Sequence, residues 1–91
     1  MKRKFSLGEM FATISIVELC KHTDLDLGPF IDRHASGDWG DVDEEHSNEM
    51  DIALENNARV WSVYHPHGRR ILIVTDADRS RTVAMLPHEY S

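Results

Sequence analysis

The chain has 91 residues, 41% of them hydrophobic, which suits one small domain with a single core. Ten Lys and Arg stand against sixteen Asp and Glu, so the formal net charge is −6 and direct nucleic-acid binding is not expected. No apolar run approaches the roughly 18 residues of a membrane-spanning helix. The basic start leads into no apolar signal core, so a cytoplasmic location is expected. Because Cys20 is the only cysteine, it excludes an internal disulfide and a cysteine-built zinc site, and no metal or cofactor is predicted.

The first half of the chain predicts one strand and two short helices. Residues 5–12 have weak strand character. The pattern Ser15-Ile-Val-Glu18 has the spacing of a capping box, so a helix is expected over residues 16–22. A second helix is expected over residues 29–35, because a proline at the first helical position loses no hydrogen bond.

The clearest helix is predicted over residues 42–56. At helical spacing its apolar residues fall on one arc and its acidic residues on the opposite side. Asp41 is the expected N-cap, and the acids of the first turn suit the helix dipole. Asn57 follows the last turn, where asparagine tolerates a left-handed backbone.

The last third predicts three strands. Residues 59–64 and 70–75 are rich in β-branched and aromatic residues, and the turn between them contains Pro66 and Gly68. After a second turn at residues 76–80, a third strand covers residues 82–86. The predicted fold is a single α+β domain (1–91): an N-terminal strand, three helices, then a three-stranded antiparallel meander, with the helices on one face of the sheet.

Trp61 is expected to lie on the strand face that it shares with Val63, buried between helix and sheet.

Two polar blocks hold the candidate binding residues. The first runs from Arg33 to Asp41 and reads R-H-A-S-G-D-W-G-D; the second, residues 75–80, reads T-D-A-D-R-S. In a structural role, these side chains would cap helices, fill the core and hold turns. In a functional role, they would form a pocket from Arg33, His34, Asp38, Trp39, Asp41, Asp76, Asp78 and Arg79.

Each block suggests a particular contact. His34 and Asp38 could form a hydrogen-bonded pair beside Trp39. Asp76 and Asp78 could face the same side, although a lone Asp-x-Asp is a weak metal signal. The two turns are predicted to pack together, with Arg79 holding Asp38 or Asp41.

The two blocks also carry a resemblance. Together with other positions, they are similar to a family of small, mostly uncharacterised bacterial proteins found on plasmids and other mobile elements. The further matching positions include Phe5, Leu7-Gly8, Ala12-Thr13, Asp43-Glu44-Glu45, Ala53-Leu54, Leu86-Pro87 and Glu89-Tyr90. The resemblance implies an accessory role on mobile DNA but no reaction. Members are often labelled as a type I restriction-enzyme subunit, yet this chain is too short for the required cofactor-binding sheet and lacks its Gly-rich loop.

The sequence therefore leaves three functions open. The first is a non-catalytic accessory protein whose partner is another protein. In a specific version it is an anti-defence protein whose eight acids between Asp38 and Glu55 imitate DNA phosphates. The second is a small-molecule or metal-binding enzyme-like domain using His34, Asp38, Asp76, Asp78 and Arg79, although no complete catalytic motif is present. The third is a homodimer that covers an edge of its sheet.

Overall fold

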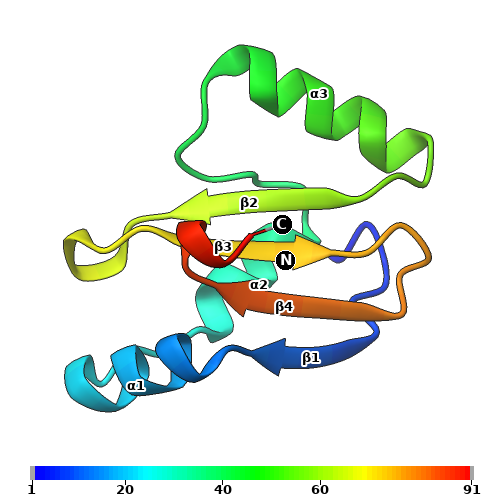
Figure 1. The fold of residues 1–91 in the computed structure, drawn as a ribbon. Coiled ribbons are helices and arrows are strands. Elements are labelled where there is room, and N and C mark those ends of the chain that lie inside the picture. The colour runs from blue at the N-terminus through cyan, green and yellow to red at the C-terminus, as the bar shows by residue number, and fades with distance from the viewer. Residues whose placement is uncertain (1, 91) are drawn as a thin grey trace.

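Four strands form a mixed sheet in the order β1-β4-β3-β2, and three helices pack around it (Figure 1). The computed structural model describes residues 2–90. The strands are β1 Glu9–Ala12, β2 Val60–Tyr64, β3 Ile71–Thr75 and β4 Arg81–Met85; the helices are α1 Ile14–Thr23, α2 Gly28–Ala35 and α3 Glu44–Glu55. Short 3-10 turns at Pro66–Gly68 and Pro87–Glu89 follow β2 and β4. The α+β class with three helices is confirmed.

The sheet differs from the predicted meander in its first strand. β2, β3 and β4 pair antiparallel in sequence order, as expected. β1 then adds as a fourth strand, parallel to β4, so that Met10 lies beside Thr82 and Ala12 beside Ala84. A parallel pair needs a long crossover, and here the crossover contains all three helices. Residue periodicity identifies a strand but does not name its partner.

The helices do not all lie on one face, and that part of the prediction is wrong. α1 and α2 cover one face, where Ile16 and Leu19 pack against Ile71 and Ile73. α3 instead runs beside β2 at the edge of the sheet (Figure 1). Met50 is its only buried side chain, so this helix buries only a narrow stripe against the edge of the sheet.

Both helix caps lie at other residues than predicted. Thr13, not Ser15, caps α1: its hydroxyl oxygen accepts from the Ile16 N–H, and Ser15 lies inside the helix. Asp43, not Asp41, caps α3 by accepting from the His46 N–H at 2.8 Å. Each cap is the last residue with an extended backbone before the first turn, which is where a short polar side chain reaches the free N–H groups.

The turn chemistry predicted for the second half is confirmed. Asn57 takes a left-handed backbone with φ 54° just after α3. Pro66 and Gly68 lie in the connection between β2 and β3, and residues 76–80 connect β3 to β4. Within residues 2–90, no helix has the length and apolarity that crossing a membrane requires.

The buried tryptophan is Trp39 rather than Trp61. Trp39 is 2% exposed and packs with Met50 and Val60. Trp61 shares a sheet face with Val63, as expected, but this face is not covered by α1 and α2. Trp61 is therefore only partly buried, with the His46 ring 3.9 Å from it, centroid to centroid.

Candidate functional site

The first polar block holds its own turn together. Arg33, in the last turn of α2, donates from Nε and Nη2 to the two oxygens of Asp38, at 2.7 and 3.3 Å. Asp38 also accepts from the Gly40 N–H, and the guanidinium lies over the Tyr64 ring. The hydrogen bond from Arg33 holds the pKa of the Asp38 carboxyl below its usual value. The pair fastens the end of α2 to β2.

His34 is fully buried in a chain of hydroxyl groups, and it does not pair with Asp38. Its Nδ1 contacts the Ser62 hydroxyl of β2, and its Nε2 lies 2.9 Å from the Thr75 hydroxyl of β3. Thr75 in turn bonds Thr82 of β4 at 2.7 Å. Burial, with a smaller contribution from the charge of Arg79, lowers the pKa of His34 to about 3, so the ring is neutral at physiological pH.

The remaining residues of the first block point to different places. Trp39 lies in the core, and its Nε1 donates to Asp51 of α3 at 2.9 Å. Asp41 lies at the surface, where its carboxylate accepts from His65 Nδ1 at 2.7 Å. The other nitrogen of His65 accepts from Arg70 at 3.2 Å.

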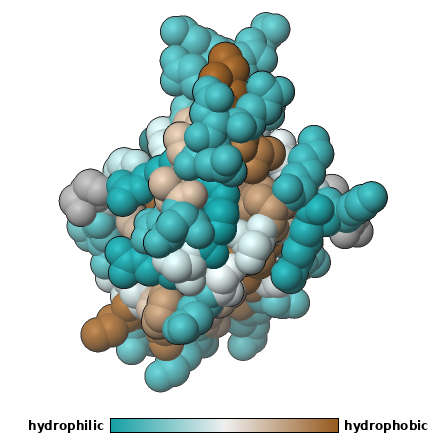
Figure 2. Space-filling model, turned by 90° about the vertical axis from the view of Figure 1, so that its right-hand side faces the viewer, coloured by the Kyte–Doolittle hydropathy of each residue, from teal (hydrophilic) through white to brown (hydrophobic). Residues whose placement is uncertain are grey.

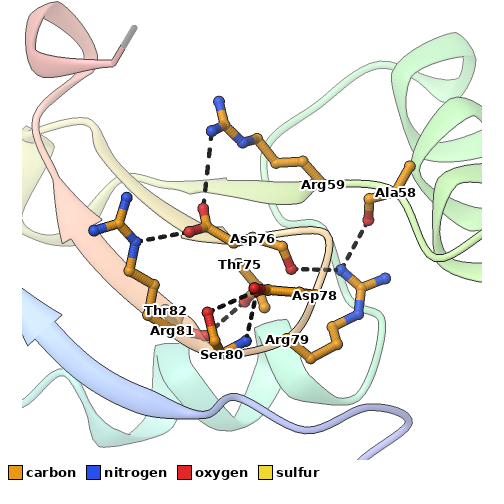
Figure 3. A network of polar contacts seen from close by, with 9 residues as sticks. All are labelled: Ala58, Arg59, Thr75, Asp76, Asp78, Arg79, Ser80, Arg81 and Thr82. Atoms are coloured by element: carbon orange, nitrogen blue, oxygen red, sulfur yellow. Dashed lines mark hydrogen bonds and ion pairs between the residues drawn. The ribbon is translucent and has the colours of Figure 1, made fainter.

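The second block is a turn stabilised by its own side chains and by three arginines (Figure 3). Asp76 accepts from Arg81 at 2.7 Å, and Arg59 approaches its other oxygen at 3.8 Å. Asp78 bonds the backbone N–H and the hydroxyl of Ser80. The strand ends at Thr75, so the two carboxylates do not form a common cation site.

Arg79 does not hold a carboxylate from the first block, so this predicted contact is wrong. Its Nη1 donates to the carbonyl oxygens of Ala58 at 2.8 Å and Asp76 at 3.1 Å (Figure 3). Its guanidinium lies over the Phe5 ring, and its own backbone is left-handed, with φ 61°. The two acids have other partners: Asp38 is bonded by Arg33, and Asp41 by His65.

This geometry makes Arg79 a structural residue, and it predicts an unusual order of stabilities. Arg79→Ala should lower the free energy of unfolding by about 2 kcal/mol, since it removes two charge-assisted hydrogen bonds and the contact with the Phe5 ring. Arg79→Gly should be less destabilising by roughly 1 kcal/mol, because glycine adopts the left-handed backbone conformation of this position without strain. Urea denaturation of the two variants measures the difference. Two variants as stable as the wild type would mean that Arg79 is free in solution.

The two blocks therefore meet in the core rather than around a pocket. Their link is the buried contact between His34 and Thr75, the residue that precedes Asp76. Among residues 2–90, no group of three or more His, Cys, Asp and Glu side chains is arranged to hold a metal ion.

A surface cavity lies elsewhere, on the sheet face that α1 and α2 leave open. It has a volume of about 390 Å³, and it is lined by Asp41, Val42, Asp43, His46, Trp61, Val63, Arg70, Leu72 and Pro87. A smaller cavity of about 100 Å³ is lined by Arg59, Val74, Asp76, Arg81, Val83, Met85, Glu89 and Tyr90. Of the eight predicted site residues, only Asp41 and Asp76 line either cavity.

Sequence reasoning missed most residues of the larger cavity. His46 gave the one usable signal, because a histidine inside the apolar arc of a helix is unusual. Its Nε2 is buried and has no hydrogen-bond partner among residues 2–90. Arg70 and Pro87 come from separate elements, which only the folded sheet brings together.

Comparison of the chain with protein-family models, with curated proteins and with solved structures found no match.

Proposed function

We propose that this protein is a non-catalytic binding protein whose partner is another protein with a basic surface. The contact surface is the outer face of α3, defined as Glu45, Asn48, Glu49, Ile52 and Glu55. The observation that carries the proposal is an exposed apolar side chain surrounded by carboxylates on this helix. The resemblance to mobile-element proteins supports an accessory role on mobile DNA, and the proposal places the protein in the cytoplasm.

Ile52 is the apolar centre of this face. It is 57% exposed, and Figure 2 shows α3 at the top of the molecule as hydrophilic residues around a small hydrophobic area. At 100° per residue, Glu49 and Glu55 fall on either side of Ile52. An apolar anchor within a charged rim is typical of a protein contact, because the anchor supplies affinity and the rim selects the partner.

Four of the five acids of α3 differ from Asp51 of the same helix and from the acids that precede the helix. Asp38, Asp41 and Asp51 are bonded by Arg33, His65 and Trp39. In contrast, four carboxylates of α3 have no hydrogen bond or ion pair within residues 2–90 and are exposed to solvent: Glu44, Glu45, Glu49 and Glu55. In the anti-defence form of the proposal, these four stand in for DNA phosphates in the cationic groove of a host nuclease.

The alternative of an enzyme-like pocket has less support. His34, Asp38, Asp78 and Arg79 line neither of the two cavities described above. His34 is inaccessible, and the other three make hydrogen bonds within their own turns or to a neighbouring backbone. Neither cavity brings these residues together around one substrate.

The test is an affinity capture from bacterial lysate at 50 mM and 300 mM salt. The wild type should retain a basic protein at low salt and lose it at high salt, because rim charges are screened. Ile52→Ala should weaken the capture roughly tenfold, as loss of an apolar anchor does. The combined variant Glu45→Gln, Glu49→Gln, Glu55→Gln should abolish it.

A matched variant removes the same charge from the rest of the surface: Glu18→Gln, Asp24→Asn, Asp32→Asn. This control should capture the same protein as the wild type. Equal capture by the α3 variant and the control would overturn the proposed surface, and so would capture that high salt does not weaken.

The outer face of α3 does not suit a second copy of the same chain. Two such faces would place carboxylates against carboxylates, which repel. Any homodimer therefore needs another surface.

A further inference from the structure

The two edges of the sheet differ in whether their backbone groups are hydrogen-bonded. The outer side of β2 is covered: the Val63 N–H donates to Trp39, the Asp41 N–H donates to Val63, and the Trp61 N–H donates to the Met50 sulfur. β1 forms the opposite edge, and within residues 2–90 its only neighbour in the sheet is β4 (Figure 1). No other strand in this part of the chain pairs with its outer side.

The backbone groups on the open side can be identified from the pairing. The Glu9 N–H donates to Ser80 and the Thr13 N–H donates to Ala84, so both point inward to β4. Peptide groups alternate along a strand, and Phe11 therefore also points inward. Met10 and Ala12 direct their N–H and C=O groups outward, where no described residue pairs with them.

The side chains at this edge are apolar and exposed. Met10 is 40% exposed and Phe11 48%; Ile14 and Val17 of α1, directly after the strand, are 81% and 41% exposed. The strand contains no lysine or proline, which commonly protect an exposed edge from pairing; its shortness and Glu9 at its first position are the protection that it has. An open edge beside exposed apolar side chains is a template for another strand.

We propose that the occupant of this edge is β1 of a second copy, paired antiparallel about a two-fold axis. In the proposed register Met10 lies opposite Ala12 of the second copy, and Phe11 lies on the axis opposite the second Phe11. The outward groups of Met10 and Ala12 then form four hydrogen bonds, and the two sheets join into one of eight strands.

Self-complementarity favours a second copy over a foreign strand. The register places Glu9 opposite Thr13, so no like charges face each other. It places the two Phe11 side chains together on one face, which buries the largest exposed apolar group of the edge. α3 lies at the far edge of the sheet, so the pairing keeps the acidic helices apart (Figure 1).

Cysteine cross-linking in a Cys20→Ser background tests both the pairing and the register. Residues on the axis form a non-hydrogen-bonded pair with Cα atoms about 4.5 Å apart, which a disulfide can span. Phe11→Cys should therefore oxidise almost completely to a covalent dimer. Met10→Cys is the matched control: its two copies lie about 8–9 Å apart, from a strand separation of about 5.5 Å and a rise of two residues, which is too far for a disulfide.

Sedimentation equilibrium of the unmodified chain gives a second measurement. The wild type should be dimeric at about 100 μM, whereas Phe11→Lys, which puts two cations together on the axis, should be monomeric with an unchanged circular dichroism spectrum. Ala12→Pro should also be monomeric, because it removes an outward N–H and leaves the bonds to β4 in place.

A wild type that stays monomeric at 100 μM would overturn the inference. A dimer that survives Ala12→Pro, or one that cross-links through Met10→Cys but not through Phe11→Cys, would overturn it as well. Ile52→Ala should not change the oligomeric state, so these results do not depend on the proposed role of α3.

Discussion

Trp39→Ala is expected to lower the free energy of unfolding by about 3–5 kcal/mol, a large part of the stability of a domain of this size. The indole is 2% exposed. It stacks on Phe5, meets the His34 ring edge-on and packs with Met50 and Val60. Truncation leaves a cavity where three segments meet, and packed neighbours fill such a cavity only in part.

Trp61→Ala is the matched control, since it removes the same side chain from a half-buried position. We expect a cost of only about 1–2 kcal/mol, because part of this indole already faces solvent in the folded state. Urea denaturation followed by circular dichroism measures both variants. Fluorescence is less suitable, because each substitution removes a tryptophan that serves as its probe. Equal costs, or a larger cost for Trp61→Ala, would contradict the assignment of Trp39 to the core.

Short sequence patterns were sufficient to predict the elements that are determined by residues close together in the chain. The proline of α2, the β-branched runs of β2 and β3 and the left-handed Asn57 each follow from chemistry within a few positions. The first strand had a weak pattern because all four of its residues are exposed. With no buried face, a strand has no period-two alternation to detect.

The errors concern contacts between distant segments. The two tryptophans differ in burial because α3 lies beside β2 at the edge of the sheet. No local sequence pattern encodes that contact. Arg79 was expected to bind a carboxylate of the first block, but its guanidinium donates to the backbone carbonyls of Ala58 and Asp76 instead. The acids that it was expected to hold are bonded by Arg33 and His65 instead.

The contacts of His34 also join distant segments and were not predicted from the sequence. The burial of this residue has a measurable consequence. The hydrogen bonds show that Nε2 of this ring carries a proton. Thr82 donates to the Leu7 carbonyl, so Thr75 must donate to Thr82, and Thr75 can then only accept from His34 Nε2–H. Nδ1 is left as an acceptor for the Ser62 hydroxyl. Burial keeps the ring neutral, so Nδ1 carries no proton and accepts.

Stability should therefore fall as the pH is lowered through the range where an unfolded histidine gains its proton. The folded pKa of about 3 lies below the ordinary 6.5, so between these values the unfolded chain binds one more proton than the folded chain. The contribution is fully present above pH 6.5 and is lost progressively toward pH 3. By pH 5 the free energy of unfolding should have dropped by about 2 kcal/mol relative to pH 7.5.

Urea denaturation between pH 7.5 and pH 5 measures this loss, and His34→Gln is the control. Glutamine keeps polar atoms near Ser62 and Thr75 but does not titrate, so the variant should be less stable at pH 7.5 and show a much weaker pH dependence. Proton NMR gives a readout that needs no variant. The His34 ring signals should stay those of the neutral form down to pH 5. A His34 signal that titrates near pH 6.5 would contradict the buried network, because only a solvated or carboxylate-paired imidazole gains its proton there.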